Sequence, residues 1–336
     1  MNLLLILLAI FLSNAPHWTS QTSGVNARLR GVSAVSAHVA WASGSGNTVL
    51  RTSDGGATWQ KLVVSTDRLD FRDIDAIDER IAYVLSIGNG AASRIYKTTD
   101  AGRTWNLQFQ ATDEKVFLDA MSFWDEDHGL VIGDAVDGQF YILRTENGGR
   151  TWARVPPAGL PAALENEGAF AASGTNIAAF GKAHAWIGTG AANKARVLRT
   201  TDGGRSWKIA EAPIVSGASA GIFSIAFRDA KHGVVVGGDY KKEKESGNNL
   251  ALTSDGGVTW TLGSGLSGFR SAVAYQPRVG AATLIAVGPS GADYSTDDGR
   301  TWRALEGRGY DTFSFVRDGS IGWGAGADGG LANMLF

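Results

Sequence analysis

TSDGGATW, residues 52–59, is the first of six copies of one phrase in this 336-residue chain. The other copies are TTDAGRTW (98–105), TENGGRTW (145–152), TTDGGRSW (200–207), TSDGGVTW (253–260) and STDDGRTW (295–302). The closing tryptophans, at positions 59, 105, 152, 207, 260 and 302, are separated by 46, 47, 55, 53 and 42 residues. A period of this length with strand patterning inside each repeat is typical of a β-propeller, in which one repeat forms one four-stranded blade.

The residues around the first copy predict the four strands of a blade. The inner strand A is LRGVSAV (29–35), strand B is VAWASG (39–44), strand C is TVLRTS (48–53), and the outer strand D is TWQKLVV (58–64). The phrase therefore falls at the hairpin between strands C and D. We call each copy a repeat turn.

The two ends of the chain together predict a seventh blade. After the sixth repeat turn come three strand-like segments, TFSFV (312–316), IGWGAG (321–326) and GLANMLF (330–336), but no fourth. HWTSQ (17–21) resembles the start of an outer strand, so we predict that it joins the last blade and leaves no open sheet edge in the ring. The expected fold is all-β, with one seven-bladed propeller domain over residues 16–336.

The repeat turns are predicted to be structural. Their aspartates can accept hydrogen bonds from turn N–H groups, their glycines permit positive φ, and their tryptophans can fill space between blades. Copies spread around a ring cannot all face one substrate. The residues concerned are Asp54, Trp59, Asp100, Trp105, Asn147, Trp152, Asp202, Trp207, Asp255, Trp260, Asp297 and Trp302, with Asn147 replacing the aspartate in the third copy.

Composition narrows the class of protein. The net charge of −2 argues against a nucleic-acid partner. The chain has no cysteine and therefore neither disulfides nor thiol chemistry. No GxGxxG phosphate loop lies between a strand and a helix, and we expect no cofactor and no metal.

The N-terminal residues 1–15, MNLLLILLAIFLSNA, resemble a secretory signal peptide with cleavage after Ala15. The apolar run is too short to span a bilayer, although a retained anchor is the alternative. We therefore expect a periplasmic or secreted monomer with no transmembrane segment in the mature chain.

The repeat turns resemble the Asp-box, or BNR repeat, of bacterial sialidases and related propellers. The whole chain resembles more closely the photosystem II stability/assembly factor-like family and its secreted bacterial branch. The stretches that carry this resemblance include FRDIDAIDERIAYVLSIGNGAASRIYKTTDAGRTW (71–105) and GPSGADYSTDDGRTW (288–302). The resemblance implies a seven-bladed propeller that binds a protein partner or assembly intermediate and has no established chemistry.

Propeller topology separates the loops into two faces. The A–B and C–D turns lie on one face, here the turn face. The B–C loops and D–A crossovers lie on the other, here the mouth face. The two longest connections, 155–170 and 237–249, belong to the mouth face, where we expect binding. His38, His128, His184 and His232 fall in separate A–B turns, so they should not converge on a metal.

Charged residues are predicted to gather at the mouth. Strand A begins there and strand B ends there, and a charge at such a position needs either a protein partner or a ligand. Ion pairing between blades and a site for a polar ligand or partner both remain open. The residues are Arg30, Asp70, Arg72, Asp119, Asp134, Glu167, Asp239, Tyr240 and Arg270.

A glycoside hydrolase, sialidase-like or other, or a carbohydrate-binding lectin is the alternative function. A hydrolase needs two carboxylates across the scissile bond, and Asp119 with Glu167, or Asp134 with Asp239, could supply them. Arg30, Arg72 and Arg270 with Tyr240 or Tyr275 would parallel a sialidase, but the Arg-Ile-Pro motif of that family is missing.

Overall fold

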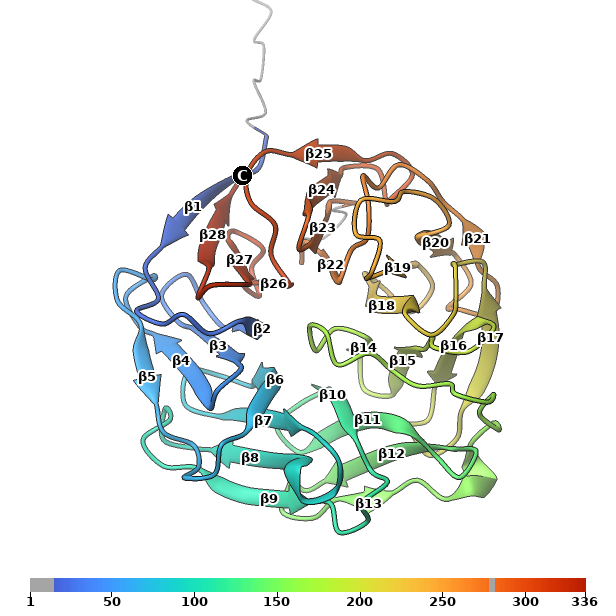
Figure 1. Ribbon diagram of the computed structural model, residues 1–336, viewed down its shortest axis with the longest axis horizontal. Helices are drawn as coiled ribbons and strands as arrows, with labels where there is room; N and C mark the ends of the chain where they lie inside the picture. The colour runs from blue at the N-terminus through green and yellow to red at the C-terminus, as the bar shows by residue number, and fades with distance from the viewer. Residues whose placement is uncertain (1–14, 278–281) are drawn as a thin grey trace, which may run out of the picture.

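The described residues form seven four-stranded antiparallel sheets arranged around a central axis (Figure 1). The computed structural model describes residues 15–277 and 282–336. The predicted all-β, seven-bladed propeller is confirmed. The predicted signal segment lies almost entirely outside the described residues and stays a prediction. Within the described ranges, no helix is both long enough and apolar enough to cross a membrane.

The first three blades follow the chain from the inner to the outer strand. Blade 1 contains β2 (Leu29–Ala34), β3 (Ala40–Gly44), β4 (Thr48–Thr52) and β5 (Gln60–Leu62). Blade 2 contains β6 (Asp70–Ala76), β7 (Ala82–Ile87), β8 (Arg94–Thr98) and β9 (Asn106–Gln110), with the short 3₁₀ turn η1 (Gly90–Ala92). Blade 3 contains β10 (Leu118–Phe123), β11 (His128–Val136), β12 (Gln139–Glu146) and β13 (Ala153–Arg154), and is followed by η2 (Pro157–Gly159).

The next three blades repeat this order. Blade 4 contains β14 (Ile177–Phe180), β15 (His184–Gly188), β16 (Ala195–Thr200) and β17 (Lys208–Ala212). Blade 5 contains β18 (Ala220–Phe227), β19 (Gly233–Asp239), β20 (Leu250–Thr253) and β21 (Thr261–Leu262). Blade 6 contains β22 (Ala272–Tyr275), β23 (Leu284–Gly288), β24 (Gly291–Ser295) and β25 (Arg303–Leu305).

Blade 7 combines both ends of the chain. It contains β26 (Thr312–Phe315), β27 (Gly322–Ala325), β28 (Leu331–Leu335) and, as its outer strand, β1 (His17–Gln21). β1 pairs antiparallel with β28, from His17 opposite Leu335 to Gln21 opposite Leu331. The Gln21 side chain also donates to the Gly55 carbonyl at 3.2 Å and accepts from Trp59 Nε1 at 3.0 Å. The N-terminal strand therefore links blade 7 to blade 1, and the two ends of the ring lie side by side in Figure 1.

Each repeat turn is held by its own side chains. In the first copy, Asp54 Oδ1 accepts from the Thr58 N–H at 2.9 Å and from Thr52 Oγ1 at 2.8 Å, while Oδ2 accepts from Thr58 Oγ1 at 2.6 Å. Because these bonds keep Thr58 in the turn, β5 begins at Gln60 rather than at the predicted residue 58. In the third copy Asn147 keeps the pattern, accepting from the Thr151 N–H at 3.0 Å and donating to Thr151 Oγ1 at 2.9 Å.

The repeat tryptophans pack against the preceding blade. Trp59 meets Trp323 of blade 7 edge-on at 5.5 Å between ring centroids, and Trp105 meets Trp41 of blade 1 at 6.1 Å. Trp18 of β1 occupies the equivalent place in blade 7, packed with Tyr310 at 4.5 Å within a cluster that includes blade 6 residues. Trp18 thus takes the place of a seventh repeat tryptophan in a ring that has only six repeat turns.

Polar side chains of the inner strands also join neighbouring blades. Ser33 of blade 1 accepts from the Ala76 N–H of blade 2 at 3.0 Å. Asp73 and Asp75 of blade 2 accept from the Met121 and Phe123 N–H groups of blade 3 at 2.7 and 3.2 Å. These bonds use backbone donors that face the channel and have no strand partner on that side.

Candidate functional site at the channel mouth

A segment of the D–A crossover into blade 4 fills the middle of the channel. This segment, residues 169–175, is here called the plug. Its Ala171 carbonyl accepts from Arg72 Nη1 of blade 2 at 2.9 Å, and its Ala172 carbonyl accepts from Arg30 Nη1 of blade 1 at 3.2 Å. In Figure 1 this stretch is the green loop beside β14 that points toward the ring centre. The sequence marked the crossover as long but did not place it inside the channel.

The far half of the plug is tied to the opposite side of the ring. Ser173 Oγ donates to the Ser271 carbonyl of blade 6 at 2.7 Å, and the Ser173 carbonyl accepts from Thr312 Oγ1 of blade 7 at 3.0 Å. Thr175 Oγ1 lies 2.7 Å from Ser224 Oγ of blade 5. The plug is therefore fixed from several directions and divides the channel into two cavities.

One cavity opens at the mouth face and has a volume of about 330 Å³. The plug forms its floor, and the walls come from strand A starts, B–C loops and D–A crossovers. This size lies at the low end of the range typical of ligand pockets. Its lining residues are Arg28, Arg30, Arg72, Phe170, Ala171, Ala172, Phe223, Tyr240, Glu243, Phe269, Ser271, Pro289 and Asp311.

Arginines of blades 1 and 2 form one wall of this mouth cavity. Arg28 binds the buried Asp311 carboxylate with both Nε and Nη2 at 2.8 Å, which raises the pKa of Arg28. Arg30 lies 4.0 Å from the same carboxylate, and burial lowers the pKa of Arg30 to about 10. Arg30 thus stays protonated at neutral pH. A guanidinium has five N–H donors, so Arg30 and Arg72 keep donors beyond those bonded to the plug carbonyls.

Aromatic rings of blades 4 to 6 form another wall. Phe170 of the plug stacks on Phe223 at 4.0 Å between centroids, and Phe269 meets Phe223 edge-on at 4.7 Å. Tyr240 contacts Phe223 at 6.1 Å and is 43% exposed, whereas Phe223 and Phe269 are buried. The mouth cavity therefore joins a cationic wall to an apolar one.

The structure brings some of the predicted mouth residues together. Arg30, Arg72 and Tyr240 line the cavity, and Asp70 pairs with Arg72 at 3.0 Å. Asp239 lies beside them in the chain and accepts from the Lys241 N–H at 3.0 Å, so it shapes the loop that carries Tyr240.

Sequence reasoning missed several residues of the cavity. Arg28 and Asp311 each stand just before an inner strand, a position that the charge pattern could have identified. Phe170, Phe223 and Phe269 gave no signal, because apolar residues at such positions are indistinguishable from core.

Arg270 does not line the mouth, contrary to the prediction. Its side chain is 1% exposed and binds Asp293 through Nε and Nη2 at 2.7 Å, while Nη1 donates to the Phe269 carbonyl. Arg270 lies just before the inner strand of blade 6, which begins at Ala272, and its guanidinium points to Asp293 on β24 of the same blade. For Arg270, the structure therefore supports ion pairing within the protein rather than a ligand site.

Glu167 is likewise occupied within blade 4. Its two carboxylate oxygens bind Arg196, and they also accept from Thr189 Oγ1 at 2.6 Å and from the Leu164 N–H at 2.8 Å. A carboxylate fixed by four donors cannot approach a glycosidic bond. The predicted pairing of Asp119 with Glu167 for glycoside hydrolysis thus lacks an available second carboxylate.

Asp119 and Asp134 instead support the plug. Asp119 accepts a hydrogen bond from the Ala171 N–H and Asp134 from the Ala169 N–H. Burial is the main reason that the pKa of Asp119 lies well above its usual range, and the nearby charge of Asp134 adds to the effect. Burial also raises the pKa of Asp134, to about 6. Asp134 also packs so closely on Gly168 that a side chain there would lie 2.1 Å from its Oδ1.

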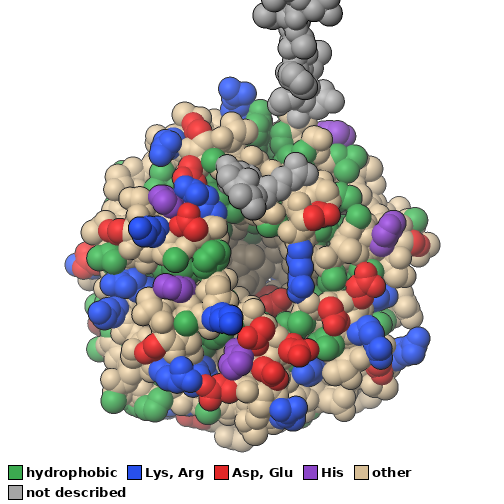
Figure 2. Space-filling model, turned by 180° about the vertical axis from the view of Figure 1, so that it is seen from behind, with side chains coloured by type: hydrophobic (Ala, Val, Ile, Leu, Met, Phe, Trp, Pro, Cys, Tyr) green, Lys and Arg blue, Asp and Glu red, His purple; other side chains and the backbone are tan. Residues whose placement is uncertain are grey.

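A second cavity of about 320 Å³ opens on the turn face, on the other side of the plug. Figure 2 looks onto this face and shows a central hollow with histidine side chains scattered around it. The hollow is lined in part by Asp73, Asp75, Ser173 and Thr175, so the plug contributes to both cavities. Tyr275 also lines it, but its hydroxyl donates to Asp298 at 2.9 Å. Tyr275 and Tyr240 therefore belong to opposite faces.

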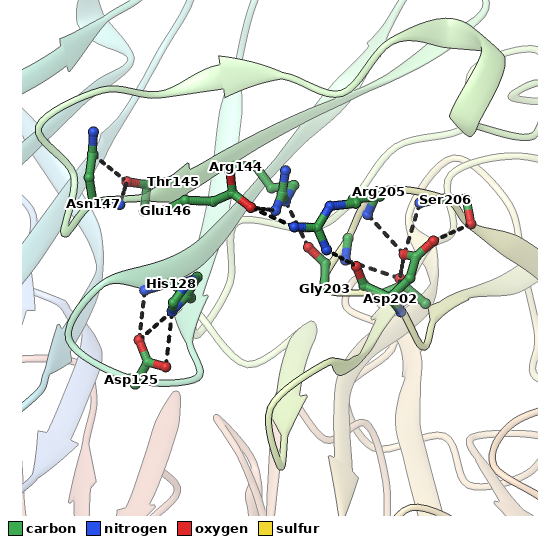
Figure 3. A network of polar contacts seen from close by, with 12 residues as sticks. Asp125, His128, Arg144, Thr145, Glu146, Asn147, Asp202, Gly203, Arg205 and Ser206 are labelled. Atoms are coloured by element: carbon green, nitrogen blue, oxygen red, sulfur yellow. Dashed lines mark hydrogen bonds and ion pairs between the residues drawn. The ribbon is translucent and has the colours of Figure 1, made fainter.

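The histidines of the turn face are held by local contacts. His128 Nδ1 lies 2.8 Å from Asp125 Oδ1 (Figure 3). His232 Nδ1 makes the equivalent contact with Asp229 Oδ1 at 3.0 Å. The neighbouring network in Figure 3 joins Arg144 and Arg205 to Glu146 across blades 3 and 4. Within the described residues, no group of three or more His, Cys, Asp or Glu side chains is placed to hold a metal ion.

Comparisons with known proteins agree on the fold. No protein-family model matches the chain, and no curated protein matches its sequence. Among solved structures, "YCF48 bound to D1 peptide" is similar with a TM-score of 0.68 and 16% identity over 95% of this chain and 97% of that one. YCF48 from Cyanidioschyzon merolae has a TM-score of 0.65 and 18% identity, covering 94% and 98% of the two chains.

A glycoside hydrolase shares the same architecture. The GH74 xyloglucanase from Xanthomonas campestris has a TM-score of 0.63 and 18% identity, covering 95% of this chain and 53% of that enzyme. At such identities the likeness concerns the fold alone, because one fold hosts many functions. Because the chain resembles both YCF48 and a xyloglucanase in fold, its function has to be argued from the site.

Proposed function

We propose that this protein is an exported, non-catalytic scaffold that binds a carboxylate-bearing segment of a protein partner in the mouth cavity. The observation that carries the proposal is the arrangement of Arg28, Arg30 and Arg72 along one wall of an open, preformed cavity. Arginine guanidinium groups suit carboxylates because they donate parallel hydrogen bonds with a charge. Arg30 and Arg72 donate to neutral plug carbonyls, and Arg72 also pairs with Asp70. Three arginines against the two carboxylates Asp311 and Asp70 leave this wall with a net positive charge for a ligand.

Two further points support a protein partner. Of the solved structures named above, the one with the highest TM-score is YCF48 with a D1 peptide bound to it. The carboxylates expected for glycoside hydrolysis are engaged elsewhere, as Glu167 and Asp119 illustrate. We also propose, from the sequence resemblance, membership of the assembly factor-like family and export through residues 1–15.

Capture from the native extract tests the proposal. Immobilised protein should retain a partner at low salt and release it as salt rises, because exposed charge contacts are screened within about 8–10 Å at physiological ionic strength. Arg72→Gln should abolish capture, since the amide removes the charge and most of the donors.

Arg80→Gln is the matched control, because Arg80 is an exposed arginine of the same blade on the turn face. Capture that survives Arg72→Gln, or that is lost equally in Arg80→Gln, would reject the mouth cavity as the binding site.

A further inference from the structure

Tyr240 is the exposed aromatic ring on the apolar wall of the mouth cavity. Phe223 and Phe269 are each only 3% exposed, because Phe170 and Ala172 of the plug cover them. Tyr240 packs its edge against Phe223 yet leaves 43% of its own surface exposed at the rim. A large exposed aromatic ring next to a desolvated aromatic cluster is the typical setting of a binding hot spot.

The loop that carries Tyr240 is held in place although its sequence, KKEKE (241–245), is typical of a solvated loop. The Tyr240 N–H donates to the Ser219 carbonyl at 3.1 Å. The Glu243 carbonyl accepts from the Phe269 N–H and from Ser290 Oγ, both at 3.0 Å. The loop is thus docked on blade 6, and little conformational freedom remains to be lost when a ligand binds.

The charge of the cavity determines what can lie beside this ring. Three arginines, Arg28, Arg30 and Arg72, stand on this wall against two carboxylates. Arg28 binds Asp311 and Arg72 pairs with Asp70, while Glu243 lies apart from them on the loop that carries Tyr240. The excess charge is positive and lies on the wall formed by blades 1 and 2. A sphere of about 330 Å³ is roughly 9 Å wide, which corresponds to two or three residues of an extended chain at about 3.4 Å each.

From these observations we infer that the mouth cavity recognises a short peptide feature, a large apolar side chain within about two residues of a carboxylate. The carboxylate lies against the arginines, and the apolar side chain packs on Tyr240. Tyr240 is then a specificity-determining residue of the site. This inference rests on the proposed function and adds to it the chemistry of the partner segment.

The plug makes this selection possible because it gives the cavity a rigid floor. Its carbonyls at Ala171 and Ala172 hold Arg72 and Arg30 in place, and its Phe170 backs the aromatic cluster. One short segment therefore positions the cationic wall and the apolar wall relative to each other. A preorganised site loses less free energy on binding than a mobile one.

Selection from a random peptide library displayed on phage tests the inference on the full-length mature chain. Peptides enriched on the parent protein should pair Asp, Glu or a free C-terminus with Phe, Tyr, Trp or Leu within two residues. Synthetic copies should bind about tenfold more weakly to Tyr240→Ala, the size expected for removing one hot-spot ring. Tyr240→Phe should bind like the parent, because the ring is retained.

Leu107→Ala serves as the matched control, because Leu107 is 48% exposed on an outer strand remote from the mouth. It should leave binding unchanged. If the enriched peptides lose binding in Arg72→Gln but show no apolar preference and bind Tyr240→Ala normally, the inference is overturned and the proposed function stands. If no peptide is enriched, or binding survives Arg72→Gln, the proposed function fails together with the inference.

Discussion

At the residue scale, the fold shifts the pKa values of two groups of aspartates in opposite directions. In the repeat turns, hydrogen bonds from Thr58 and Thr104 lower the pKa of Asp54 and Asp100 to about 2. On the inner strand of blade 2, burial raises the pKa of Asp75 to about 6. The turn aspartates therefore stabilise the fold above pH 4 and lose this effect as the pH falls toward 2. The contribution of Asp75 is complete below pH 4 and is lost as the pH rises through about 6.

Asp75→Asn should therefore raise the free energy of unfolding at neutral pH. The amide oxygen can still accept from the Phe123 N–H, while the cost of an inward-facing charge disappears. We expect a gain of about 1–2 kcal/mol at pH 7.5 and little gain at pH 4.5, on the scale of 1.36 kcal/mol per pKa unit. Urea unfolding at both pH values measures the difference. Asp78→Asn, an exposed position after the same strand, reports the effect of losing a surface charge, and equal gains in the two variants would refute the role of burial.

At the scale of single elements, β1 has two functions. It completes the hydrogen bonding of β28, and through Trp18 and Gln21 it fills the spaces on both sides of blade 7. An unpaired β28 would present an open sheet edge, which is a site for aggregation.

Deleting residues 16–24 should accordingly lower the thermal midpoint and promote aggregation. The loss includes the partly buried Trp18, and removing a fully buried tryptophan costs at most about 3–5 kcal/mol by itself. Differential scanning calorimetry and light scattering measure the effect. A synthetic peptide of residues 16–24, added in excess, should restore part of the midpoint by strand addition. An unchanged midpoint in the deletion variant would show that β1 does not stabilise the ring.

At the scale of the whole molecule, the plug converts an open ring into two separate cavities. Residues from blades 1, 2, 5, 6 and 7 hydrogen-bond to a segment that belongs to blade 4. The floor of the mouth cavity thus depends on contacts between parts of the chain that are far apart in sequence.

Ser173→Ala should loosen this floor without unfolding the ring. The substitution removes the bond to the Ser271 carbonyl, worth about 1 kcal/mol for a typical hydrogen bond, and leaves that carbonyl without its donor. Hydrogen exchange should accelerate at the amides of residues 169–176, whereas the inner strands of blades 1 and 2 should keep their protection. Ser320→Ala, on an exposed turn, is the control. Uniform acceleration throughout the ring would instead indicate global destabilisation.

The sequence by itself determined the number and order of the blades. A repeat turn contains its own hydrogen-bond partners within eight residues, so its geometry can be predicted from the local sequence. Six such turns and a three-strand remainder together define seven blades. The same local logic placed the mouth face and, on it, Arg30, Arg72 and Tyr240.

The tertiary structure alone decided which charges remain available for a ligand. Asp119, Glu167 and Arg270, like Arg72, are charged residues near the start of an inner strand. Their partners lie in other strands or in the plug, and these partners bury them. No periodicity indicates that residues 169–175 turn into the channel or that Phe170 meets Phe223. These contacts depend on where the ring brings distant segments together, and a side chain becomes part of a site only when its surroundings leave it facing the cavity.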